Sequence, residues 1–255
     1  DALILERARR RLSPYGERVE FVNLNFDAVG GHLTGLAGRV SCFLYDFGIS
    51  SYHLDASGRG FSLQRDEPLD MRLDGRGAPD ARHILNKYSE IRLTDIIKKY
   101  GEERWAGKIA RAICRRREEK PFETTGELAG LVLEAIPRKF HVRNIHPATR
   151  VFQALRIEVN DELGSIERSL AASIDCLAAG GRCIAISFHS LEDRIVKNVF
   201  RSLAKPKPAG PGEKQPVPKV TLLTPRPLTP EEDEIAGNRR SRSAKMRVCE
   251  RVEIQ

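Results

Sequence analysis

The first stretch of sequence that could do chemistry runs from Asp46 through Gly48 to His53. A carboxylate followed closely by glycine can approach a ligand because glycine has no side chain in the way. A turn with a capping aspartate explains the same residues equally well. A second stretch, residues 59–72, combines dense charge with glycine, phenylalanine and methionine, which suits a loop folding over a ligand or a solvated loop.

A third stretch begins at His146 and continues through Arg150. Counting from Thr149, steps of four, three and four residues place Gln153, Arg156 and Asn160 on one helical face. A polar stripe within an α/β core is costly unless its groups are hydrogen-bonded. An exposed polar face is the alternative interpretation.

The fourth stretch, residues 187–194, places Ser187, His189 and Asp193 close together. A hydrolase triad is rejected because triad members normally come from separate segments and the chain has no G-x-S-x-G motif. Ser190 instead suits the N-cap of a helix, with Asp193 at position N3. His189 alone is more typical of a structural residue than of a catalytic one.

Two apolar runs, residues 40–46 and 182–188, predict strands buried on both faces of a parallel sheet. Helices are expected at residues 2–12 and from Pro147 through Leu170 to a stop at Gly180 and Gly181. Strands that alternate with helices indicate an α/β fold. Ligands of such sheets bind at the carboxyl ends of the strands, where Asp46 and Phe188 fall.

The remaining elements are weaker or peripheral. Residues 81–136 have a helical pattern that includes a capping box from Thr124 to Glu127. A short strand is expected at residues 19–22, and a terminal hairpin at residues 220–223 and 246–248. Residues 205–219 contain five prolines and four lysines, which is typical of a linker.

The composition favours a nucleic-acid partner. The net charge is +8, and residues 98–120 carry nine basic and four acidic side chains. The apolar runs are all shorter than the roughly 18 residues that cross a membrane. The five cysteines form no C-x-x-C pair, so we expect a reducing compartment and no metal site.

Six stretches together resemble the MraW-type family of small-subunit ribosomal RNA cytosine-N4 methyltransferases. They occur in the family's order across nearly the whole chain, which makes the match specific although each stretch alone is weak. The matching stretches are DFGISSYHLD, RGFSLQRDEPLDMRLD, YGEERWAGKIARAI, HPATRVFQALRIEVNDEL, GGRCIAISFHSLEDRIVK and NRRSRSAKMRV.

The resemblance implies a Rossmann-like class I methyltransferase core with an inserted all-helical subdomain. We expect residues 1–60 and 146–255 to form the core and residues 61–145 to form the subdomain that recognises substrate. It also implies S-adenosylmethionine as methyl donor, small-subunit ribosomal RNA as partner and the bacterial cytoplasm as location. No membrane partner is expected, and a homodimer is left open.

The family's site residues are expected at matching positions of this chain. The resemblance implies that Asp1, Phe26, Asp46 and His53 border the donor, and that Asp46 and Asn160 act in catalysis. The residues expected to contact base or phosphate are His146, Arg150, Arg156, Ser187, His189, Arg240 and Arg242.

Two departures from the family leave alternatives open. The family has a Gly-Gly-His loop after its first strand, which binds the methionine end of the donor, and we expect this N-terminal segment to be missing from this sequence. Gly30-Gly31-His32 has the same letters but follows a later strand region, so it is interpreted as a decoy. The family usually has glutamine where this chain has His53. A non-catalytic RNA-binding or ribosome-assembly protein derived from such an enzyme is therefore the competing hypothesis.

Overall fold

The computed structural model describes residues 1–75, 79–143, 145–210 and 213–253. Contacts divide the chain into two compact units, each with its own hydrophobic core. The helical unit comprises residues 1–23 and 49–162, and the sheet unit comprises residues 24–48 and 163–255. These units do not follow the expected division at residues 61 and 145, and a substrate-recognition role for residues 61–145 stays a prediction.

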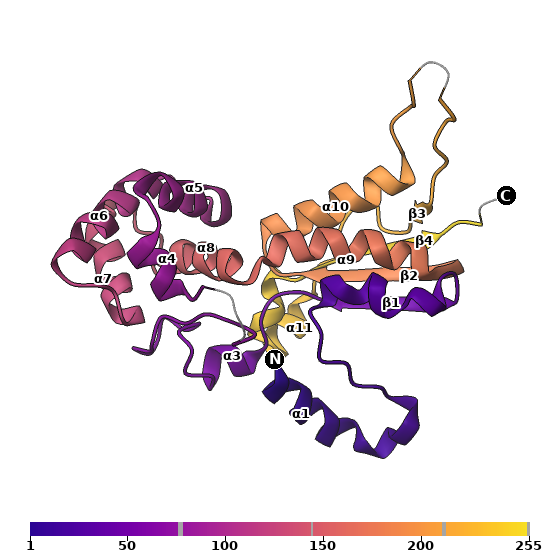
Figure 1. Ribbon diagram of the computed structural model, residues 1–255, viewed down its shortest axis with the longest axis horizontal. Coiled ribbons are helices and arrows are strands. Elements are labelled where there is room, and N and C mark those ends of the chain that lie inside the picture. Colours follow the sequence, from indigo (N-terminus) through magenta and orange to yellow (C-terminus); the bar gives the residue numbers. More distant parts are fainter. Residues whose placement is uncertain (76–78, 144, 211–212, 254–255) are drawn as a thin grey trace. The chain divides into compact units, whose positions relative to one another are not determined.

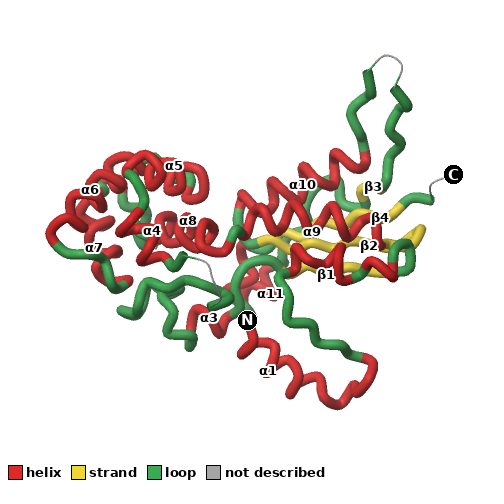
Figure 2. Tube along the Cα trace, viewed as in Figure 1, coloured by secondary structure: helices red, strands yellow, loops and turns green. Residues whose placement is uncertain are grey.

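Helices build the first unit, as Figure 2 shows in red. Five of them, α4 to α8, surround its core (Figure 1). The elements of the helical unit are α1 (Ala2–Leu12), η1 (Ser13–Arg18), α3 (Ser51–Asp55), α4 (Ala81–Lys87), α5 (Glu90–Gly101), α6 (Ala106–Glu119), α7 (Thr125–Ala135), η4 (Arg138–Phe140) and α8 (Thr149–Asn160).

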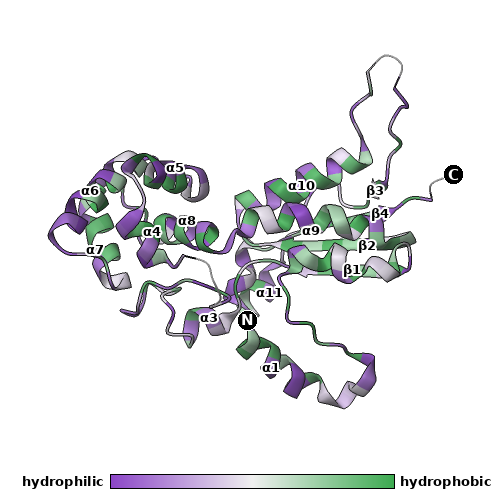
Figure 3. Ribbon diagram, viewed as in Figure 1, coloured by the Kyte–Doolittle hydropathy of each residue, from purple (hydrophilic) through white to green (hydrophobic). Residues whose placement is uncertain are grey.

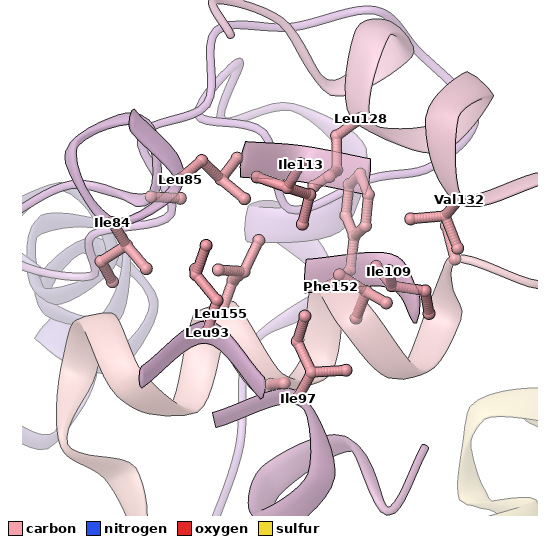
Figure 4. Close-up of a cluster of buried hydrophobic side chains, with 14 of the residues drawn as sticks. Ile84, Leu85, Leu93, Ile97, Ile109, Ile113, Leu128, Val132, Phe152 and Leu155 are labelled. Atoms are coloured by element: carbon pink, nitrogen blue, oxygen red, sulfur yellow. The ribbon is translucent and has the colours of Figure 1, made fainter. Parts of the chain in front are cut away.

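Apolar side chains at helical spacing form the core of this unit. Leu93 and Ile97 of α5, Ile109 and Ile113 of α6, and Leu155 of α8 point toward one another (Figure 4) and are fully buried. Ile109 and Ile113 are four residues apart, so they lie on one face of α6, within the helical pattern predicted for residues 81–136. The predicted capping box of α7 is confirmed.

The contact between α5 and α8 depends on a glycine. A Cβ atom at Gly101 would lie 2.6 Å from the carbonyl oxygen of Arg150, closer than real Cβ contacts allow. Gly101 therefore lets α5 end directly against α8. The next residue, Glu102, has a left-handed conformation that ends the helix.

A sheet of four strands forms the second unit. The strand order is β1-β2-β4-β3, with β1 parallel to β2 and the other neighbours antiparallel. The strands are β1 (Val40–Asp46), β2 (Leu177–Ser187), β3 (Val220–Leu222) and β4 (Lys245–Arg251). The helices are η2 (Phe26–Ala28), α2 (Val29–His32), η3 (Thr34–Leu36), α9 (Glu162–Cys176, in this unit from Leu163), α10 (Ser190–Ala204), α11 (Glu232–Gly237) and η5 (Arg239–Ser243).

The α/β prediction is confirmed, including the parallel strand pair and the C-terminal hairpin of β3 and β4. Figure 3 shows that β1 and β2 are largely hydrophobic. One expectation for β1 is wrong: Cys42 and Leu44 are exposed, so only one face of this strand is buried. Among the described strands, β1 lies at the edge of the sheet.

One predicted strand and two predicted element boundaries were wrong. Residues 19–22 form no strand, because this short apolar run has no pairing partner among the described strands. The helix expected to run from Pro147 to Gly180 begins at Thr149 and divides at Asp161, whose φ is 45°. Gly181 lies inside β2, where a Cβ atom would come within 2.9 Å of the carbonyl oxygen of Val40.

Among the described residues, the helices are all too short or too polar to cross a membrane.

Candidate functional site

The carboxyl ends of β1 and β2 lie side by side in the sheet unit. Asp46 pairs with Ile186, and the backbone N–H of Phe47 donates to the carbonyl oxygen of Ile186 at 3.0 Å. Parallel pairing brings both strand ends to one edge of the sheet, as expected from the sequence. Asp46 is exposed there, so its carboxyl group can reach a ligand.

A sharp turn follows Asp46. Gly48 has a φ of +92°, a conformation that side chains rarely adopt. An added Cβ atom would meet the side chains of Glu192 and Phe188 at 3.8 Å, which is ordinary contact. The backbone conformation, rather than lack of space, therefore requires glycine at this position.

Glu192 is a completely buried carboxylate beneath this edge. One of its oxygens, Oε2, accepts hydrogen bonds from the backbone N–H groups of Phe188 at 2.7 Å and His189 at 3.2 Å. Desolvation raises the pKa of Asp46 above its ordinary value, and the charge of Glu192 raises it further. The Asp46 carboxylate is consequently more basic than a free aspartate.

The capping residue of α10 differs from the expected one. His189 is the N-cap and forms a capping box with Glu192, so Ser190 is the first helical residue. Asp193 instead forms two hydrogen bonds with Arg247, at 2.7 and 3.2 Å. Burial raises the pKa of Asp193, but the hydrogen bonds and charge of Arg247 outweigh it and lower the pKa overall.

Aromatic rings line the sheet unit next to the strand end. Phe26 lies 5.8 Å from Phe47 and 6.2 Å from Tyr45, measured between ring centroids, and remains 41% exposed. Phe26 begins η2 rather than ending a strand. The structure thus places Phe26 against the residue that follows Asp46, where an exposed ring could stack on a heterocycle.

The two other predicted residues on β2 and α10 have structural partners. Ser187 is buried, and its hydroxyl donates to the carbonyl oxygen of Lys245 at 3.3 Å. The His189 side chain is 14% exposed and lies 3.2 Å from Glu192 Oε1. Both residues lie at the carboxyl end of β2, and their expected contact with a base stays a prediction.

In the helical unit, Asp1 and His53 form one buried cluster with Arg59. His53 Nε2 lies 2.9 Å from Asp1 Oδ2, and Arg59 also bonds to this oxygen. The Ser50 backbone N–H donates to His53 Nδ1 at 3.2 Å, so Nε2 carries the proton given to Asp1. Burial, followed by the charge of Arg59, lowers the pKa of His53 to about 4.

Asn160 uses its whole side-chain amide within the helical unit. Its oxygen accepts from the backbone N–H of Leu73 at 2.8 Å, and its nitrogen donates to the carbonyl oxygens of Met71 at 2.8 Å and Arg156 at 2.9 Å. Met71 has a φ of 58°, so this anchor holds a strained turn. The catalytic role of Asn160 stays a prediction, and its present geometry is that of a positioning residue.

The other predicted residues of the α8 region are also engaged. Arg156 forms a bidentate ion pair with Glu162 at 2.8 and 2.9 Å. Arg150 donates to the carbonyl oxygen of Glu102 at 3.3 Å and stays about half exposed. His146 is exposed, and its Nδ1 accepts from the backbone N–H of Ala148 at 3.1 Å.

The two arginines predicted to bind phosphates lie on η5, which precedes β4 in the chain. Arg240 and Arg242 are exposed on η5. Arg242 and Arg239 line a hollow of about 540 Å³ together with Ile235 of α11 and the carboxylate of Glu232. The hollow therefore mixes two cations with one acid.

Glu192 and Arg59 belong to these clusters but were not predicted from the sequence as site residues. The signal for Glu192 was its position three residues after His189, the spacing of a capping box. Arg59 carried no comparable signal, because its pairing with Asp1 spans 58 residues of sequence.

Comparison with known proteins adds an independent result. The model of the MraW methylase family matches residues 1–252. The chain belongs to this family. It therefore has a class I methyltransferase fold, to which the parallel β1–β2 pair and the antiparallel β4 and β3 strands of the sheet unit correspond.

Three similar relatives bear the name ribosomal RNA small subunit methyltransferase H. The protein of Geotalea uraniireducens is 48% identical over 96% of this chain and 80% of its own length. The proteins of Syntrophus aciditrophicus and Clostridioides difficile are 46% and 44% identical over 99% of this chain, and over 82% and 83% of their own lengths. The family resemblance expected from the six motifs is confirmed.

Proposed function

We propose that this chain transfers a methyl group from S-adenosylmethionine to the exocyclic N4 of a cytidine in small-subunit ribosomal RNA. Family membership and the names of the relatives support RNA methylation. The observation that carries the proposal is the exposed Asp46 carboxyl group at the end of β1, two residues before the Gly48 turn and next in sequence to Phe47, which the Phe26 ring contacts.

The types of residue at this edge of the sheet suit the binding of a methyl donor. Phe26 offers an exposed aromatic ring for a purine, and Gly48 permits close approach of the backbone. When bound, S-adenosylmethionine supplies an electrophilic methyl group. Asp1 and His53 are further candidates for the donor, although each is now hydrogen-bonded within the helical unit.

The Asp46 carboxylate also suits cytosine, the base that receives the methyl group. The exocyclic nitrogen of cytosine is a poor nucleophile because its lone pair is delocalised into the ring. A carboxylate that accepts a hydrogen bond from this amino group favours the geometry in which the lone pair is available. The raised pKa of Asp46 strengthens it as a proton acceptor.

The RNA must present an unpaired or flipped base for this chemistry. Asn160, Ser187 and His189 are the residues we assign to holding the base or its loop. Cations would hold the phosphates, which makes binding sensitive to salt. These cations are Arg150, Arg156, Arg240 and Arg242, and His146 is a further candidate. The proposed location is the bacterial cytoplasm, and a homodimer stays open.

One observation favours a second function. Asp1, His53 and Asn160 are all hydrogen-bonded by their own chain rather than directed at an open site. A non-catalytic RNA-binding protein for ribosome assembly would have this character. It would bind RNA but bind no methyl donor.

The first experiment is calorimetric titration of this chain with S-adenosylhomocysteine. Micromolar binding supports the donor site, and binding of RNA without the donor product supports the second function. The chain is then incubated with labelled S-adenosylmethionine and small subunits that lack the modification. Digestion and mass analysis of the nucleosides should give N4-methylcytidine, and any other methylated nucleoside would contradict the proposed position.

A further inference from the structure

An aromatic pair surrounded by cations lies on the helical unit, outside the site described above. Trp105 and Phe140 have ring centroids 5.3 Å apart at an angle of 45°. The Arg104 guanidinium lies 4.2 Å from the Phe140 centroid, and the Lys139 ammonium lies 5.2 Å from it. Lys108 lies 5.8 Å from the Trp105 centroid. We refer to these five residues as the Trp105–Phe140 patch.

The patch is built into the fold rather than loosely attached. Glu103 is buried, and its Oε1 accepts from the Trp105 backbone N–H at 2.9 Å. On the other side, the Phe140 N–H donates to the carbonyl oxygen of Pro137 at 2.9 Å. The His141 ring nitrogen Nε2 lies 2.9 Å from the carbonyl oxygen of Ile136. The backbone N–H groups of both aromatic residues are thus held by hydrogen bonds, that of Trp105 to a side chain and that of Phe140 to the backbone.

Exposure and charge at the patch both suit a nucleic acid. Phe140 is 38% exposed, and Arg104, Lys108 and Lys139 are exposed. The two segments that form the patch, residues 102–108 and 137–143, carry five cations against two acids, of which Glu103 is buried and lies 3.8 Å from Arg150. A solvated cationic surface does not need an exposed phenylalanine between its charges.

We propose that the Trp105–Phe140 patch binds an unpaired nucleotide of the RNA substrate, with the base stacked on Phe140 and Arg104 and the phosphates held by Lys139 and Lys108. Aromatic rings and arginine planes stack on bases that are not already paired and stacked in a helix. Duplex RNA offers no such face to the ring. That the RNA is ribosomal rests on the proposed function, whereas the stacking contact rests on the patch alone.

The protein carries its own reporter for this contact, since Trp105 is its single tryptophan. Titration with a short single-stranded oligoribonucleotide should change the tryptophan fluorescence. Phe140→Leu keeps an apolar side chain but removes the ring, and should weaken binding about five- to hundredfold. Lys139→Gln should reduce the salt dependence of binding. The duplex of the same sequence should bind more weakly than the single strand.

Tyr15→Leu is the matched control. Tyr15 is an exposed aromatic residue with Arg18 at 5.3 Å from its ring, so the variant also removes an arginine–aromatic pair. It should bind the oligonucleotide like the unaltered chain. Unchanged binding by Phe140→Leu, in protein that melts at the normal temperature, would overturn the proposal. An equal fluorescence change with polyglutamate would assign the patch to an acidic protein instead.

Methylation of small subunits separates this proposal from the proposed function. If the chain methylates subunits and Phe140→Leu has the same KM for subunits as the unaltered chain, the result contradicts the binding role of the patch and supports the proposed function. If the chain binds the oligonucleotide through Phe140 but methylates no RNA, the result supports the binding role of the patch and contradicts the proposed function. A raised KM with unchanged kcat in Phe140→Leu supports both.

Discussion

Three predicted site residues of the helical unit and two of the sheet unit differ in how their side chains are engaged. In the helical unit, Asn160, Arg156 and His53 each satisfy their hydrogen bonds within the unit. In the sheet unit, Asp46 and Phe26 stay exposed beside the strand ends. A group that is fully engaged holds backbone in place, whereas an exposed group can meet a ligand. This difference is consistent with the proposed function, in which Asp46 at the strand end takes part in the reaction and Asn160 of α8 is a positioning residue.

The largest effect should come from Asp46→Asn. This variant keeps the size of the side chain but removes the proton acceptor, so the methylation rate should fall about 10²- to 10⁴-fold. Single-turnover methylation measures the rate, and thermal melting checks the fold. A variant that folds normally and methylates at the full rate would contradict the assignment of chemistry to the sheet unit.

Leu155→Ala tests whether the units have independent cores. Leu155 is fully buried in the helical unit, so its truncation should lower the free energy of unfolding of that unit by about 2–5 kcal/mol. Hydrogen exchange should show faster exchange in α5 to α8 and little change in β2 and β4. Ile91→Ala is the control, because Ile91 is 76% exposed and should change stability by less than about 0.5 kcal/mol.

His53→Gln tests the buried cluster of the helical unit by pH. The pKa of His53 is about 4 in the folded protein against 6.5 ordinarily, so between these values the unfolded chain binds a proton that the folded chain does not. Stability should therefore fall by about 3 kcal/mol as the pH drops from 6.5 to 4. Denaturant titration across this range should show a shallower fall in His53→Gln, and an equal slope would place the pH dependence in other groups.

Asn160→Ala should have the smallest effect. It leaves the carbonyl oxygen of Met71 and the N–H of Leu73 without their present partner, which should cost about 1–3 kcal/mol of stability. For a positioning residue, KM should rise more than kcat falls. A loss of kcat as large as that of Asp46→Asn, at unchanged stability, would restore Asn160 to a catalytic role and weaken the comparison.

The strand end that carries the proposed site could be located from the sequence. An apolar run that stops at Asp46 predicted a strand end, and parallel strands bring their carboxyl ends together. The roles of single side chains could not be assigned in this way. Asn160 was predicted as a site residue from its residue type and its place on one helical face. Its hydrogen-bond partners Met71 and Leu73 lie 89 and 87 residues earlier in the chain. Spacing along one helix contains no information about such partners.

The sequence alone determined the family, the α/β class and the position of Asp46, because periodicity and the order of motifs can be followed along the chain without knowing how it folds. Only the tertiary structure decided that Glu192 is buried under the strand end and that Arg59 pairs with Asp1 across 58 residues of sequence. It also brought Trp105 to Phe140 across 35 residues of sequence. Burial and long-range pairing depend on how helices and strands pack. Packing brings together residues that are separated by irregular distances in the sequence, so no sequence pattern predicts these contacts.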